Sequence, residues 1–217
     1  MIGLDKISAV AITLAVVATI ILSTFSTTTV VVFPITITVA ALGLEWVWTH
    51  RLRKGEESEL GAEVEKKISG WQLRNIGFYS ALALVVMLGT GYFFDWFDVG
   101  AIVGMATTDA YAYSLSIAVA EEVFFRLLIT DLLLVSHLPA SLSRFSFLDT
   151  PAFKLIVSGV FFGLVHTARY GASFESMAYV IVGGCALSFV SYKCKSITPA
   201  IIAHAANNFL AVGGFLQ

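Results

Sequence analysis

The stretch EEVFFR, residues 121–126, lies inside an apolar run that extends from about residue 111 to residue 135. A run of that length predicts a helix that crosses a bilayer. Two adjacent acids and an arginine at that depth are costly, so they indicate either a structural ion pair or a functional site. Glu122 and Arg126 are spaced i, i+4 with the acid first, which predicts an ion pair within one helix. Glu121 is rotated about 100° from Glu122 around the helix axis, so the i, i+4 spacing that pairs Glu122 with Arg126 does not pair Glu121 with it. Glu121 is therefore the candidate general base.

The composition is that of an integral membrane protein. Of the 217 residues, 58% are hydrophobic and only 13% are charged, and the mean hydropathy is +0.86. Soluble domains contain about 25% charged residues. The small net charge of −2 and the lack of a basic tract argue against nucleic acid as a partner. Two cysteines are too few for a disulfide framework, and their spacing is not that of a zinc site.

Seven apolar segments predict an all-α fold, a polytopic bundle of about seven transmembrane helices. They cover about residues 7–25, 29–49, 75–94, 111–136, 152–168, 174–192 and 197–214. We interpret the first as a spanning helix and not as a cleaved signal peptide, because its basic region is weak and no Ala-x-Ala-like site follows. The sequence thus predicts a single integral membrane domain over residues 1–217, multi-pass in the cell membrane. Residues 1–94 would form N-terminal helices and a cytoplasmic loop, and residues 111–214 the catalytic core.

The basic residues predict the orientation in the membrane. If seven helices alternate, eleven of the thirteen basic residues fall on one side, six of them in the polar stretch of residues 50–74. This side is predicted to be cytoplasmic. We expect residues 50–74 to be a solvated loop or a surface-lying helix. The apolar residues 99–108 are too short to span and predict an outer loop or a re-entrant turn.

Small residues predict where helices touch. Gly159 and Gly163 form a G-x-x-x-G pattern, and Gly183 and Gly184 are adjacent in the middle of the next apolar segment. Small side chains let helix backbones approach closely in lipid.

Further polar residues lie within the last apolar segments. His166 ends the sequence FFGLVH of residues 161–166. His204 and Asn208 are spaced i, i+4, so one helix face presents two hydrogen-bond donors. Asn207 lies on an adjacent face and could serve the same role. Each histidine taken alone is also compatible with helix packing.

Together these residues fit hydrolysis of an amide. Glu121 would take a proton from water, and His166 would hold and polarise that water. His204 and Asn208 would stabilise the oxyanion, because preorganised donors act most strongly in a site of low dielectric. No serine or cysteine is suitably placed as a nucleophile.

These motifs resemble those of the CPBP family of intramembrane endopeptidases, which includes the type II CAAX prenyl endopeptidases. The family pattern is E-E-x-x-x-R, F-x-x-x-H and H-x-x-x-N. It corresponds here to Glu121-Glu122-x-x-x-Arg126, Phe162-x-x-x-His166 and His204-x-x-x-Asn208. The resemblance covers about residues 111–214. It implies a glutamate-dependent, CAAX-protease-like hydrolase with these six catalytic residues and no cofactor. The partners that it implies are membrane lipid and a peptide or protein substrate that can carry a lipid modification. The family fold has an eighth helix after H-x-x-x-N, whereas this sequence ends at Gln217.

Two alternatives remain open at this point. The same hydrolysis could be run by zinc, with Glu121, His166 and His204 as ligands, because three N/O ligands plus water form an ordinary catalytic zinc site. The chain could also be a non-catalytic membrane scaffold or an immunity-type binding protein that keeps its polar core for packing.

Overall fold

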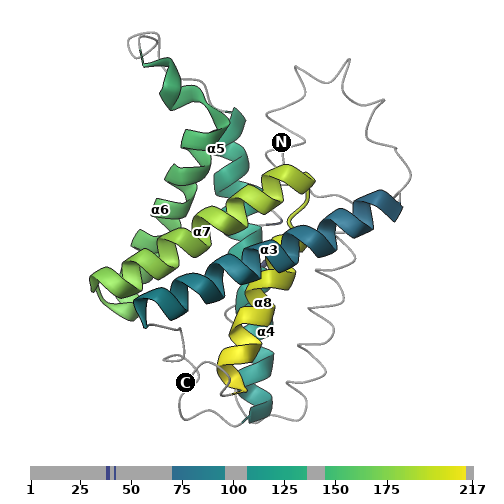
Figure 1. Cartoon of the computed structure of the whole chain (residues 1–217), viewed down its shortest axis with the longest axis vertical. Helices are drawn as coiled ribbons and strands as arrows, with labels where there is room; N and C mark the ends of the chain where they lie inside the picture. The colour runs from purple at the N-terminus through teal and green to yellow at the C-terminus, as the bar shows by residue number, and fades with distance from the viewer. Residues whose placement is uncertain (1–37, 40–41, 43–69, 96–106, 136–144, 214–217) are drawn as a thin grey trace.

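The computed structural model describes residues 38–39, 42, 70–95, 107–135 and 145–213 (Figure 1). Their regular secondary structure is entirely helical, which confirms the predicted all-α class for this part of the chain. The elements are α3 (Gly70–Phe94), α4 (Thr107–Glu122), the π-helix η2 (Val123–Thr130), α5 (Asp131–Val135), the 3₁₀-helix η4 (Ser146–Asp149), α6 (Pro151–Tyr170), α7 (Phe174–Cys194) and α8 (Thr198–Val212).

Several predictions fall on residues that lie outside this description. They are the segment 7–25, nearly all of 29–49, residues 50–69 of the polar stretch, and residues 99–106. The number of spans and the orientation in the membrane therefore stay predictions. Helix α3 begins at Gly70, inside the stretch predicted as a solvated loop or a surface-lying helix, and its apolar part begins at Arg74.

Two helices in the described part of the chain are long and apolar enough to cross a membrane. They cover Arg74–Phe94 and Phe174–Cys194, with mean hydropathies of 1.7 and 1.5. A shorter apolar helix covers Pro151–Thr167. Exposed aromatic side chains line α3, with Tyr92 and Phe93 each more than three-quarters exposed. Such a surface is suited to contact with lipid.

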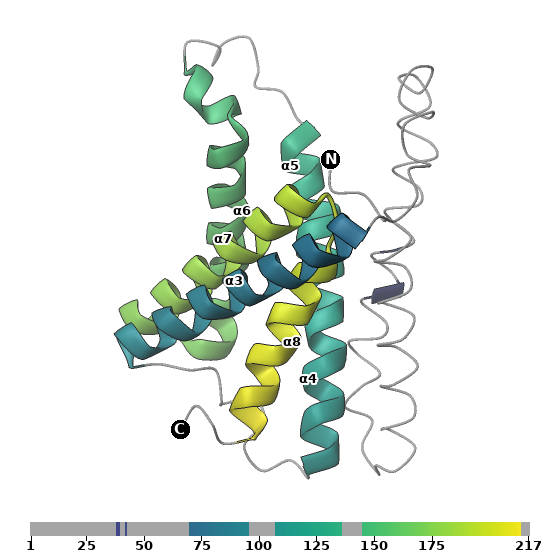
Figure 2. The ribbon, with the colours of Figure 1, turned by 45° about the vertical axis from the view of Figure 1, so that its right-hand side comes forward.

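The helices form two crossing pairs. Helices α3 and α7 pack side by side and run obliquely across α8, while α8 packs along α4 (Figures 1 and 2). Helix α6 packs against the outer side of α7. The core where α3, α7 and α8 meet contains Ala83, Met87, Leu187, Val190, Ala200 and Ala203. The alanines let the three backbones approach, as small residues do in membrane bundles.

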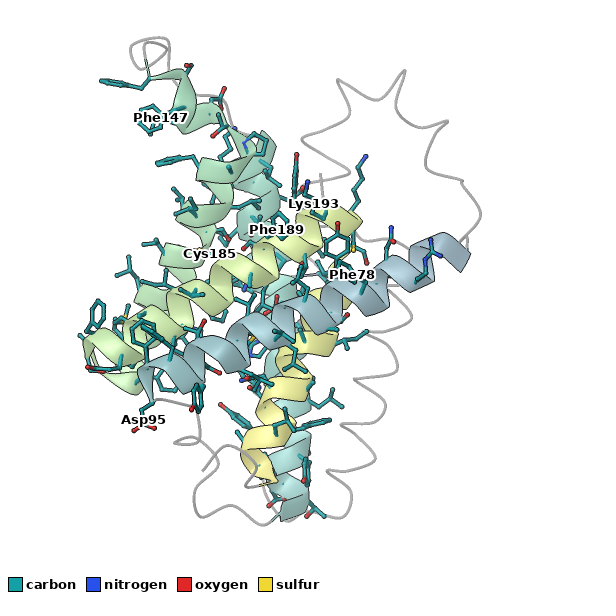
Figure 3. The ribbon with its side chains drawn as sticks, viewed as in Figure 1. Phe78, Asp95, Phe147, Cys185, Phe189 and Lys193 are labelled. Atoms are coloured by element: carbon teal, nitrogen blue, oxygen red, sulfur yellow. The ribbon has the colours of Figure 1, made fainter. Side chains whose placement is uncertain are left out.

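Glycines bring α6 and α7 into close contact, as the sequence predicted. A Cβ atom on Gly159 would lie 2.6 Å from the backbone nitrogen of Cys185, and one on Gly163 would overlap the side chain of Ile181. A Cβ on Gly184 would lie 3.1 Å from the carbonyl oxygen of Gly159. Figure 3 shows Cys185 on α7 where the two helices meet. This contact fixes α6, and with it His166, against the rest of the bundle.

The long helix after Thr107 is not uniformly α-helical. The predicted helix over residues 111–136 is present, but it changes to a π-helix at Val123, directly after Glu122. The hydroxyl of Thr130 donates to the carbonyl of Phe125, five residues earlier, at 2.7 Å. It also contacts Ser158 at 2.6 Å, and Ser188 donates to Ser158 at 3.2 Å. Hydroxyls from η2, α6 and α7, all fully buried, thus hold the wider turn in place. Such π segments are frequent at functional sites.

Candidate active site

The acid–arginine pair predicted from the sequence is present. Arg126 Nε lies 2.9 Å from Glu122 Oε2, and both side chains are completely buried. The guanidinium, which keeps its proton in proteins, donates its Nε–H to this carboxylate oxygen. The pair spans the junction between α4, which ends at Glu122, and the π-helix η2, which contains Arg126.

The rest of the Arg126 guanidinium is held by aromatic rings. Neither terminal nitrogen has a hydrogen-bond partner among the described residues. The carbon Cζ lies 4.8 Å from the ring centroid of Phe162 and 5.9 Å from that of Phe125. A cation over an aromatic face at these distances is attracted by about 2 kcal/mol when it is desolvated. Phe162, the first residue of the F-x-x-x-H motif, thus supports the charge of Arg126.

His204 is fixed by the other oxygen of Glu122. His204 Nδ1 lies 2.8 Å from Glu122 Oε1. Because the Glu122 carboxylate already accepts from Arg126 and offers an acceptor oxygen here, we assign the proton of this hydrogen bond to Nδ1 of His204. The opposite ring nitrogen, Nε2, then faces Glu121, at 3.7 Å from its Oε2 atom.

His166 is fixed in the same way, but by its own helix. Its Nδ1 lies 2.7 Å from the carbonyl oxygen of Phe162, so Nδ1 is again the donor. Its Nε2 lies 3.4 Å from Oε2 of Glu121. The ring packs 4.3 Å from that of Phe162 and stacks at 5.6 Å on that of Tyr170. Since 162, 166 and 170 are four apart, one stripe of α6 clamps the imidazole.

Glu121 is the point where these residues meet. Its carboxylate faces the Nε2 atoms of both histidines and is 16% exposed, whereas Glu122 is completely buried. The two neighbouring acids therefore have different surroundings: Glu122 holds Arg126 and His204, and Glu121 is presented to a solvent-accessible space.

A small cavity opens beside the two histidines. Its volume is about 30 Å³, which accommodates about two water molecules. Its walls come from α3, α6, α7 and α8, and its polar members are His166, His204, Asn207, Asn208, Tyr170 and Tyr179. The remaining walls are apolar, including Met87, Val180 and Leu187.

The structure brings both asparagines to this cavity, although the sequence placed them on adjacent helix faces. Asn208 is half-buried, and its Nδ2 donates to the backbone carbonyl of Ser114 on α4 at 3.4 Å. Asn207 is buried, and its Oδ1 accepts from the hydroxyl of Tyr179 at 3.1 Å. Sequence reasoning missed two polar neighbours, Tyr170 and Tyr179. For Tyr179, nothing in the sequence links α7 to α8 at this point.

The zinc alternative requires three ligands around one point. Ligand atoms of a tetrahedral zinc site lie about 3.3 Å apart, given Zn–N and Zn–O bonds of about 2.0–2.1 Å. Here Glu121 Oε2 lies 3.4 and 3.7 Å from the two Nε2 atoms. Across the described ranges, no group of three or more His, Cys, Asp or Glu side chains is placed to hold a metal ion.

Comparison with known proteins connects this site to one family. A family model described as type II CAAX prenyl endopeptidase Rce1-like matches residues 103–210. The matched range contains all six of the candidate catalytic residues. No curated protein and no solved structure matches the chain.

Proposed function

This chain belongs to the Rce1-like family of type II CAAX prenyl endopeptidases, and we propose that it hydrolyses a peptide bond with a water molecule activated by Glu121, without a metal. The observation that carries this proposal is the convergence of the two Nε2 atoms on the Glu121 carboxylate, next to a cavity of the size of two waters. Membership in the family supports an intramembrane endopeptidase of the CAAX-protease type. The catalytic roles below are our assignment.

Glu121 and His166 bind the attacking water. With Nδ1–H committed to the carbonyl of Phe162, Nε2 of His166 offers a lone pair beside a carboxylate oxygen. Two acceptors 3.4 Å apart need a donor between or beside them, and a water molecule supplies two O–H groups. Glu121 takes one proton as the water oxygen attacks the substrate carbonyl carbon, and His166 orients the water through the other.

His204 and Asn208 stabilise the oxyanion that forms. Glu122 accepts the Nδ1–H of His204 and supplies a negative charge that stabilises a second proton on this ring. When His204 carries a proton on Nε2 as well, this N–H is a donor toward the cavity. Asn208 adds an amide N–H, since its Nδ2 carries two hydrogens and only one is directed at Ser114. Fixed donors of this kind account for a large part of catalysis in acyl transfer.

The second half of the reaction returns the proton. Glu121 donates the proton taken from water to the departing amine nitrogen while the C–N bond breaks. The other product is a carboxylic acid, whose carbonyl carbon has gained the water oxygen. The base becomes the acid, so no side chain is consumed and no covalent intermediate is formed.

The family description implies a C-terminal CAAX peptide that carries a prenyl group as the substrate class. The exposed apolar surface of α3 and α7 would let a lipid-modified peptide enter from the bilayer. A suitable probe is an internally quenched peptide with a farnesylated CAAX end, and its unprenylated counterpart measures whether the lipid is needed.

The primary test is Glu121→Gln, which is isosteric but cannot accept the proton. We expect cleavage to fall to background while the thermal melt in detergent stays unchanged. Glu175→Gln is the matched control, because Glu175 is an exposed glutamate in the first turn of α7. Activity above a few per cent in Glu121→Gln would refute the general-base assignment.

The two alternatives give different results in the same assay. A zinc enzyme would lose activity on dialysis against a chelator and regain it with added zinc, whereas the proposed mechanism is indifferent to both. Metal analysis of the purified protein is the independent readout. A scaffold or immunity-type protein would cleave neither peptide.

A further inference from the structure

We propose that Asn207 is a second amide donor to the oxyanion and that Tyr179 is the residue that positions it. The inference rests on the proposed function, since it concerns the same cavity and the same reaction. The structural basis is the hydrogen bond in which the hydroxyl of Tyr179 donates to Oδ1 of Asn207 at 3.1 Å.

This hydrogen bond determines which end of the Asn207 amide is available. A carboxamide has an acceptor end and a donor end, and an O–H bond to Oδ1 commits the acceptor end to Tyr179. Nδ2 therefore points away from Tyr179, and within the described residues it has no hydrogen-bond partner. Asn207 lines the cavity together with His166 and His204, and we assign its uncommitted N–H groups to the reaction side.

Burial of both residues fixes the orientation of the Asn207 amide. Asn207 is 2% exposed and Tyr179 is 4% exposed. The ring of Tyr179 is packed in an apolar cluster with Phe125, Phe162 and Val180, so its hydroxyl has a fixed direction. Nδ2 of Asn207 is not among the fully buried side-chain atoms that lack a hydrogen-bond partner, so it keeps contact with accessible space. An oxyanion in the cavity would satisfy that donor only while the tetrahedral intermediate exists, which is what favours catalysis over ground-state binding.

Asn207 is better preorganised for this role than its neighbour. Asn208 is less buried, and its Nδ2 is partly directed to the Ser114 carbonyl at the long distance of 3.4 Å. The two asparagines act from adjacent positions of α8, Asn207 through an orientation set by α7 and Asn208 through one set by α4. The oxyanion site thus depends on the packing of α8 between these helices.

The test compares turnover of the farnesylated quenched peptide by single and double variants of the full chain. Asn207→Asp keeps the acceptor for Tyr179 but replaces the N–H₂ group, and we expect turnover to fall by roughly 10²–10³-fold with little change in KM. Tyr179→Phe removes only the hydroxyl, and we expect a fall of roughly tenfold, which corresponds to one ordinary hydrogen bond. Tyr192→Phe, on the same helix but outside the cavity, is the control and should turn over normally.

A double-mutant cycle separates positioning from a purely structural role. In an Asn207→Ala background, Tyr179→Phe should have no further effect on turnover, because the amide that it orients is gone. Additive effects on turnover, or wild-type turnover in either Asn207→Asp or Tyr179→Phe, would overturn the inference. Thermal melts show whether Asn207→Asp and Tyr179→Phe are folded. If one of them fails to fold, the turnover of the other decides whether the inference holds. If Glu121→Gln is inactive while these variants are normal, this inference alone fails; if Glu121→Gln is active, the proposed function fails.

Discussion

Arg126→Met tests whether the buried charge pair stabilises the fold as well as the site. Methionine keeps most of the arginine stem but removes the cation that lies 2.9 Å from Glu122. Two unit charges at that distance attract by about 6 kcal/mol at an effective dielectric constant of 20. Loss of one partner of a buried pair costs about 3–5 kcal/mol, because the other charge stays buried.

The surroundings of Glu122 place the expected value in the lower part of this range. His204 still donates to Glu122 at 2.8 Å, so the stranded carboxylate keeps one partner. We expect a loss of about 3–4 kcal/mol, which for a chain of this size lowers Tm by about 6–16 °C. The measurement is a thermal melt in detergent, read by tryptophan fluorescence, with peptide cleavage measured on the same sample.

Two further variants serve as controls for the stability change measured in Arg126→Met. Lys193→Met removes an exposed cation that lies 5.6 Å from the ring centroid of Phe189, and it should cost under about 1 kcal/mol, because the charge is already in contact with water. Glu122→Gln combined with Arg126→Met removes both charges and should recover at least half of the lost stability, but not the activity. Wild-type stability in Arg126→Met, or no recovery in the double variant, would refute this reasoning. A stable but inactive Arg126→Met would instead make the arginine a direct participant in catalysis.

Three other predictions concern the oxyanion site, the contact between α6 and α7, and the hydroxyls that hold the π-helix. Asn208→Ala should lower turnover by roughly 10²–10³-fold with KM nearly unchanged, and initial rates within twofold of wild type would remove it from the oxyanion site. Gly159→Val should prevent folding, because its Cβ would lie 2.6 Å from backbone of α7, whereas Gly89→Val, with nothing within 4 Å, should express and melt normally. Thr130→Val should lower the free energy of unfolding by about 1–3 kcal/mol, since it leaves buried hydrogen-bonding groups without a partner; an unchanged chemical-denaturation midpoint would contradict this.

Much of the candidate site could be predicted because its contacts are local. The pairing of Glu122 with Arg126 is set by helical spacing, which the sequence displays directly. The close approach of α6 and α7 follows from the glycines, because only residues without side chains permit it. That His166 and His204 would face Glu121 was a chemical expectation, and the distances of 3.4 and 3.7 Å are consistent with it.

The parts that could not be predicted depend on contacts between distant segments. The π-helix is held by hydroxyls of Thr130, Ser158 and Ser188 from three different elements, and no local propensity marks such a turn. The bond between Tyr179 and Asn207 links residues 28 positions apart, and it decides which end of an amide faces the cavity. Helical spacing on α8 alone favoured Asn208 and left Asn207 as a competitor.

The π-helix has a consequence for how relatives of this protein are compared. A turn closed over five residues contains one residue more than an α-helical turn. If a relative has lost that one residue between Val123 and Thr130, its acids can occupy the same place while every later position along the helix is shifted by one. Alignments that forbid gaps inside helices would then set its helix α5 out of register with this one. A one-residue gap placed in this segment would restore the correspondence, and it would mark a lineage in which the wider turn has been removed.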